Sequence, residues 1–154
     1  MLLIALLLAV QTVAVPEEPV APYAMSDANA GAKPVAGDGL WRAFHGRAGV
    51  DRIVDDLVAR SIADTRIGDI FRGQDMVRLR RTLREQFCYI LNGGCAYSGR
   101  TMKESHRDLG IQQADMGALV ENLQAAMRRE GVPFMAQNRL LAKLAPMKRD
   151  IVER

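Results

Sequence analysis

A single histidine stands out among the residues whose side chains could do chemistry. His106 lies in the stretch TMKESHRDLGI, residues 101–111; the only other histidine, His45, falls in a turn and is expected to face solvent. If residues 101–111 are helical, Met102, His106 and Leu109 share one face, and the imidazole points inward. Burial disfavours an imidazolium, so the ring is expected to be neutral, the form that binds metals. The alternative is a core histidine hydrogen-bonded to a carbonyl, which residue type alone favours by about two to one.

Two features of the sequence shift this balance towards a ligand. The predicted helix is short, because Thr101 and Glu104 form a capping-box pattern at its start and Gly110 ends it. The sequence offers no cluster of His, Cys and carboxylate residues for a tetrahedral protein site. A metal bound by His106 therefore needs a cofactor for its other ligands. Haem provides this, since its porphyrin supplies four nitrogens and one histidine completes the proximal side.

The two cysteines, Cys88 and Cys95, are seven residues apart. This spacing does not match a CxxC motif and no second pair exists, so a zinc site is not expected. In an oxidising compartment the two thiols would pair, whereas in the cytosol they would stay reduced, one buried and one in a loop. The sequence alone leaves the disulfide open.

Apolar residues at three- and four-residue steps predict an almost entirely helical domain over residues 39–154. No alternating, strand-like run interrupts this pattern, so an α/β enzyme fold is excluded. Gly94, Gly131 and Pro133 mark helix ends. The expected helices are a short one over 40–44, a long one from Val50 through Ile62, one or two turns within 65–71, and then helices over 76–91, 101–110, 112–130 and 135–152.

The first 38 residues fall into two segments. Residues 1–15, MLLIALLLAVQTVAV, hold a hydrophobic run of about ten residues, which is typical of a secretory signal and too short for a stable membrane span. No Lys or Arg precedes this run, so an N-terminal extension or a misassigned start is the alternative. Residues 16–38 are rich in Pro, Ala and Gly and have no apolar period, so we expect a disordered linker.

The net charge of +3 is unevenly distributed, since the first 38 residues contribute −3 and residues 39–154 carry +6. The stretch RLRRTLRE places four arginines on one predicted helix. At least two of them are expected to face solvent, and the others suit the carboxylates of a haem. Nucleic acid is not an expected partner, because the stretch lacks interleaved aromatic residues and a recognition motif.

From Leu40 to the C-terminus the sequence resembles the group I truncated haemoglobins. The resemblance is carried by DIFRGQDMVRLR, by LNGG followed by CAYSGRTMKESHRDLGI, and by GVP before the last helix. It implies an all-α, two-over-two helical sandwich, which is a shortened globin fold. It also implies that His106 is the proximal haem ligand, that Phe71 packs on the haem face and that Met102 lines the proximal side.

The distal side departs from the pattern of this family. Group I members usually carry a Tyr on the second helix and a Gln on the distal helix, and by position these sites are Val58 and Leu83 here. Neither side chain donates a hydrogen bond, so we expect an unusually apolar distal pocket. The other candidate haem-facing residues are Leu79, Phe87, Met116 and Leu119.

The resemblance implies a protein that holds haem b and reversibly binds O₂, NO or CO, with a redox partner protein as a further expectation. The alternative is a haem enzyme for nitric oxide detoxification or peroxide chemistry, which the lack of a distal acid–base group disfavours. A third hypothesis is a globin fold that acts without haem. The first 15 residues favour export to the periplasm or the medium; without a signal there, the protein would be cytoplasmic.

Overall fold

The computed structural model describes residues 14–153, so the predicted signal lies almost wholly outside the described part. Helices account for all regular structure in this part, which confirms the all-α class. A single-turn 3-10 helix, η1 (Asp27–Ala30), comes first. The other elements are α1 (Gly39–Ala43), α2 (Gly46–Ala63), α3 (Gly68–Phe71), α4 (Met76–Ile90), α5 (Met102–Ser105), α6 (Gln113–Glu130), α7 (Phe134–Leu144), η2 (Ala145–Met147) and α8 (Lys148–Ile151).

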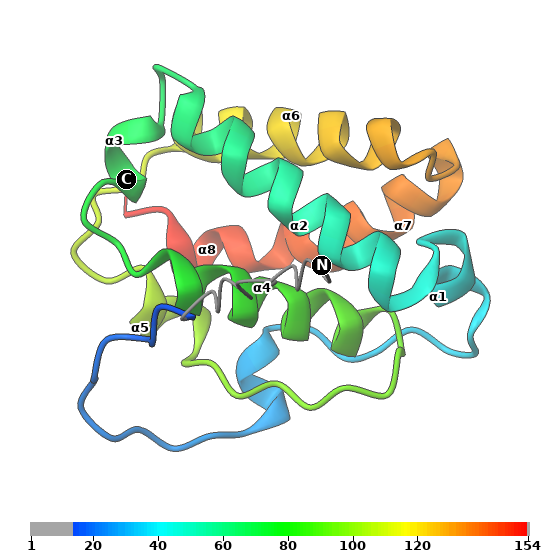
Figure 1. Ribbon diagram of the computed structural model, residues 1–154, viewed down its shortest axis with the longest axis horizontal. Coiled ribbons are helices and arrows are strands. Elements are labelled where there is room, and N and C mark those ends of the chain that lie inside the picture. The colour runs from blue at the N-terminus through cyan, green and yellow to red at the C-terminus, as the bar shows by residue number, and fades with distance from the viewer. Residues whose placement is uncertain (1–13, 154) are drawn as a thin grey trace, which may run out of the picture.

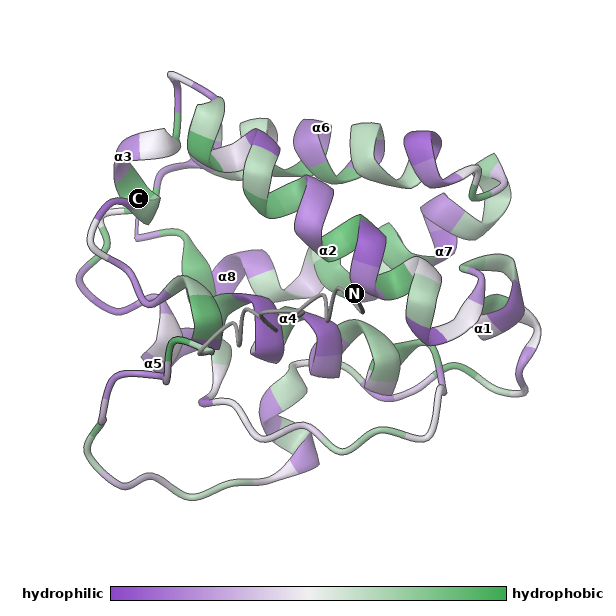
Figure 2. Ribbon diagram, in the orientation of Figure 1, coloured by the Kyte–Doolittle hydropathy of each residue, from purple (hydrophilic) through white to green (hydrophobic). Residues whose placement is uncertain are grey.

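The helix α2 is the centre of the sandwich, because it packs against both α6 and α4 (Figure 1). The side chains of its predicted apolar stripe are buried, with one exception: Ile62, in the last turn, is 46% exposed. Hydrophobic and polar residues are interspersed along α2, α4 and α6 (Figure 2), and most of the buried residues of these helices are hydrophobic. Burial of these hydrophobic residues is the main force that holds the layers together.

The start of α2 and the course of the final helix differ from the predicted ones. The helix α2 begins at Gly46, four residues before Val50, because His45 takes a left-handed conformation (φ +61°) that starts the helix directly after the turn. The predicted final helix is divided into α7, η2 and α8. Pro146 lies at this division. Proline lacks the N–H that a continuous α-helix requires, so the helix is interrupted there.

Residues 16–38, for which a disordered linker was expected, are mostly exposed but contact the rest of the chain at defined points. Ala30 is fully buried and Val35 is 8% exposed, both within the core. The Val35 N–H donates to the Ile90 carbonyl at 2.9 Å, and the Asp27 carboxylate accepts from the Tyr97 N–H at 2.8 Å. These are isolated long-range contacts, so they leave no periodic signal in the sequence.

The two cysteines form a disulfide, Cys88–Cys95, with their Cα atoms 5.7 Å apart. It ties the end of α4 to the loop that leads towards α5.

Closing a loop of this size is expected to stabilise the fold by about 2 kcal/mol. We therefore expect Cys95→Ser to lower the free energy of unfolding by that amount in urea denaturation. Reductant should shift the wild type towards the variant and leave the variant unchanged, and an unshifted wild type would contradict the prediction.

Glu130, at the end of α6, connects that helix to the start of α2. Its carboxylate accepts two hydrogen bonds from Arg52, at 2.6 and 2.9 Å, and lies 2.9 Å from Nδ1 of His45. The hydrogen bonds from Arg52 lower the pKa of Glu130 from 4.5 to about 2. A lowered carboxyl pKa stabilises the fold above pH 4.5, and this contribution is lost as the pH falls from 4.5 towards 2.

We expect Glu130→Gln to lower the free energy of unfolding by about 1–2 kcal/mol at pH 7, a range reduced because Arg52 is exposed. At pH 3 the difference from the wild type should be smaller. Urea denaturation at the two pH values measures both effects. Asp38→Asn is the control, since its pair with Arg42 is exposed on both sides and contributes little. Equal effects of the two substitutions would refute the role of Glu130.

Candidate functional site

A cavity of about 670 Å³ lies between α2, α4, α5 and α6. Its lining is mainly apolar, and its volume is in the range of pockets that hold a cofactor. The structure brings all nine site residues predicted from the sequence to this one cavity: Val58, Phe71, Leu79, Leu83, Phe87, Met102, His106, Met116 and Leu119.

His106 reaches the cavity from a shorter helix than expected. The helix α5 contains only Met102–Ser105, and His106 is its C-cap. Thr101 caps its start as predicted, since its hydroxyl accepts from the Glu104 N–H at 3.2 Å. The helix does not continue to Gly110, because the chain turns at Asp108, which has a left-handed conformation (φ +63°).

The hydrogen bond of His106 determines which ring nitrogen can bind a metal. Its Nδ1 lies 2.7 Å from the backbone carbonyl oxygen of Met102, which can only accept, so Nδ1 carries the proton. The lone pair is therefore on Nε2. Burial lowers the pKa of His106, although the contact with Met102 opposes this shift. A neutral ring with an oriented Nε2 at a cavity wall is the arrangement of a metal ligand.

The walls away from His106 consist of apolar side chains from several helices. Leu79 and Leu83 of α4 and Met116 and Leu119 of α6 are only partly buried, because they face the cavity instead of packed neighbours. Val58 of α2 is 1% exposed and lines the same space. Such walls suit a large apolar group and exclude water from it.

Two polar side chains that the sequence analysis missed also line the cavity. Ser61 is fully buried, and its hydroxyl has no hydrogen-bond partner among the described residues. Gln86 is 6% exposed and donates from Nε2 to the Ala30 carbonyl at 2.8 Å. Both follow a predicted cavity residue by three positions, Val58 and Leu83 respectively. Their spacing places them on the cavity face of each helix, whereas their polar side chains suggest exposure.

No group of three His, Cys, Asp or Glu residues able to hold a metal ion occurs in residues 14–153. His106 is therefore a candidate for a single protein ligand to a metal whose other ligands belong to a cofactor. The fold and the site together define a small all-helical protein with a mainly apolar cavity and one histidine in its wall whose free nitrogen could bind a metal.

Comparison with known proteins identifies this class further. The model of the bacterial-like globin family matches residues 39–153. Group 1 truncated hemoglobin GlbN of Nostoc sp. (strain MUN 8820) is 30% identical over 115 residues, covering 75% of this chain and 98% of the relative. The Synechocystis protein of the same name is 30% identical over 119 residues, covering 73% and 96%. The chain belongs to the bacterial-like globin family, among the group 1 truncated haemoglobins.

Solved structures agree on the fold. Truncated hemoglobin from Tetrahymena pyriformis in the Fe(III) form matches with a TM-score of 0.71 and 22% identity, covering 75% of this chain and 98% of that one. The 2/2 hemoglobin from Synechococcus sp. PCC 7002, in the cyanomet state with covalently attached heme, matches with a TM-score of 0.69 and 23% identity at the same coverage. The two-over-two sandwich predicted from the sequence is confirmed.

The family implies a haem, and the cavity fits one. His106 would hold the iron through Nε2, and the remaining walls would offer apolar contacts to a flat ring. Arg100 and Lys148 also line the cavity and would supply positive charge for the carboxylates of such a ring. None of the described helices is long and apolar enough to cross a membrane.

Proposed function

We propose that this protein holds haem b through His106 and reversibly binds a diatomic gas on the opposite face. One observation carries the proposal: His106 lines the cavity, and because its Nδ1 donates to Met102, the lone pair that can bind a metal is on Nε2. When bound, haem iron supplies a coordination position for O₂, CO or NO. The chain contributes the axial nitrogen, fixes its tautomer and keeps water away with apolar walls.

The residues opposite His106 support gas binding over catalysis. Val58 and Leu83, at the usual positions of Tyr and Gln, offer neither a hydrogen bond nor a proton. Nitric oxide dioxygenation and peroxide chemistry normally use a distal group that moves a proton or stabilises charge. We therefore propose a binding protein, with a haem enzyme as the second candidate. A redox partner that keeps the iron reduced completes the proposed cycle.

We further propose that the protein is exported. The hydrophobic run at the start of the sequence and the Cys88–Cys95 disulfide support this independently, since stable disulfides form in oxidising compartments. Detection of the folded protein in periplasmic or culture fractions would support export, and recovery only from the cytosol would contradict it.

An absorption spectrum of the purified protein titrated with hemin tests the haem proposal. The expected result is stoichiometric binding, with a Soret band typical of histidine ligation that shifts when the reduced protein takes up CO. A protein that leaves the hemin spectrum unchanged would end the proposal. The same sample exposed to peroxide or to O₂ and NO would reveal turnover, which a binding protein lacks.

A further inference from the structure

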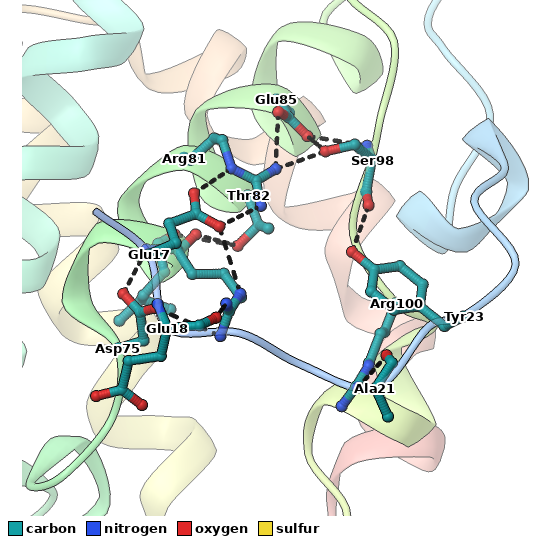
Figure 3. Close-up of polar contacts among 12 residues, drawn as sticks. Glu17, Glu18, Ala21, Tyr23, Asp75, Arg81, Thr82, Glu85, Ser98 and Arg100 are labelled. Carbon is teal, nitrogen blue, oxygen red and sulfur yellow. Dashed lines mark hydrogen bonds and ion pairs between the residues drawn. The ribbon is translucent and has the colours of Figure 1, made fainter.

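Residues 17–23 form a strap that runs past α4 to the loop before α5 (Figure 3). Two of its side chains, Val20 and Tyr23, line the same cavity as His106. The strap precedes the part of the chain that matches the globin family, which begins at residue 39. It therefore adds a wall to the cavity from outside the matched domain.

An acidic side chain fastens one end of the strap to α4. The Glu17 carboxylate accepts from the Arg81 guanidinium, with one contact at 2.9 Å, and lies 3.5 Å from that of Arg78. The hydrogen bond from Arg81 lowers the pKa of Glu17, so the acid stays ionised at neutral pH. Glu17 therefore pairs with two of the four arginines of α4, Arg78 and Arg81.

The backbone at Glu18 makes the next contacts. Its N–H donates to the Asp75 carboxylate at 2.7 Å, and its carbonyl accepts from Arg78. The Glu18 side chain is exposed, and its carboxylate points away from the other labelled residues (Figure 3). Glu17 and Glu18 are thus adjacent residues of equal charge, of which only the first uses its side chain to hold the strap.

The other end of the strap is attached to the loop that leads into α5. The Tyr23 hydroxyl donates to the Ser98 carbonyl at 2.7 Å. Arg100 donates to the Ala21 carbonyl at 3.2 Å, and its guanidinium lies 5.0 Å from the centre of the Tyr23 ring. Arg100 comes two residues before Met102, the first residue of α5. The strap therefore bridges the two elements that border the cavity at its α4 and α5 sides.

We propose that the strap closes the edge of the haem site between α4 and α5, so that haem leaves only after the Glu17 fastening opens. This inference rests on the proposed haem binding. Val20 and Tyr23 provide the barrier, and the ion pairs of Glu17 with Arg78 and Arg81 set how often it opens. Because these groups are partly exposed, salt weakens the fastening.

Charge reversal at Glu17 and at Glu18 distinguishes the loss of the Glu17 ion pairs from the effect of a change in net charge. Glu17→Arg places a cation against Arg78 and Arg81, whereas Glu18→Arg makes the same change in net charge on an exposed side chain. Any general attraction between an added arginine and haem carboxylates affects both variants. We expect haem transfer from Glu17→Arg to excess apomyoglobin to be about tenfold faster than from the wild type and Glu18→Arg. Glu17→Gln should lie between them, about two- to fivefold faster.

Amide hydrogen exchange of the haem-free protein provides a readout that does not depend on haem. The Glu18 N–H should exchange faster in Glu17→Arg and remain as in the wild type in Glu18→Arg. Added salt should speed haem loss from the wild type but not from Glu17→Arg. If all the variants bind hemin and lose it at the same rate as the wild type, the proposed role of the strap is wrong, while the proposed haem binding is unaffected. A wild type that binds no hemin would overturn the proposed function, while the exchange data would still show whether Glu17 holds the strap.

Discussion

Replacing His106 with alanine is expected to abolish stable haem retention. Nε2 of His106 is the candidate axial nitrogen, and the cavity is otherwise lined mainly by apolar side chains. Loss of the ligand leaves only apolar contacts and charge pairing at the rim, so the affinity for hemin should fall by at least about a hundredfold. Hemin titration followed at the Soret band measures this loss. Gel filtration of the reconstituted protein shows whether haem stays bound.

The second histidine provides the control for this substitution. His45 lies on the surface beside Glu130, away from the cavity lining, so His45→Ala should retain the same Soret band. His106→Gly with added imidazole should recover part of the spectrum, because the free ring can occupy the space of the lost side chain. A His106→Ala protein that keeps a CO-responsive band would mean that another residue ligates the iron.

Replacing Val58 with tyrosine is expected to slow O₂ release by about tenfold to a hundredfold. Val58 lines the cavity from α2, at the position where family members usually carry a tyrosine. A hydroxyl there would donate a hydrogen bond to bound O₂, and such a bond to a partly charged acceptor contributes about 1.5–3 kcal/mol. Bound CO is less polar, so its release should change little. Stopped-flow displacement of O₂ and of CO gives the two rates.

A phenylalanine at the same position separates the hydroxyl from the ring. Val58→Phe adds nearly the same side-chain volume as Val58→Tyr but no hydrogen-bond donor. It should therefore leave the ratio of the O₂ and CO release rates close to that of the wild type. If Phe slows O₂ release as much as Tyr does, the effect is steric. If the wild type itself releases O₂ slowly, the prediction of a distal pocket without a donor is wrong. The Ser61 hydroxyl, which has no partner among the described residues, would then be the donor to test by substitution.

The helical sandwich and its cavity lining were predictable because both depend on a repeated pattern. Residues three or four positions apart on α2, α4 and α6 bury one face, and a periodic signal survives without knowledge of the neighbouring helices. The start of α5 and the ends of α4 and α6 were also close to expectation, where capping residues or glycines mark them. The outcome for α5 shows the limit, since its single turn ends at Ser105 although the apolar spacing continues to Leu109.

The order of residues 16–38 and the polar lining of the cavity were not predictable in the same way. Glu17 and Tyr23 form contacts with residues more than 60 positions away, and no local pattern distinguishes them from solvated side chains. Ser61 and Gln86 lie at helical positions that match the cavity face, yet residue type alone suggests exposure. Only the packed neighbours decide that these two groups are buried.

The strap is synthesised before every residue that holds it. Its partners follow 57 to 79 positions later in the chain. Closing such long loops requires the ordering of much intervening chain, whereas α2 packs against α4 and α6 without the strap. We therefore expect the sandwich to form first and the strap to fasten last. Haem taken up in that interval would be enclosed by the final step of folding.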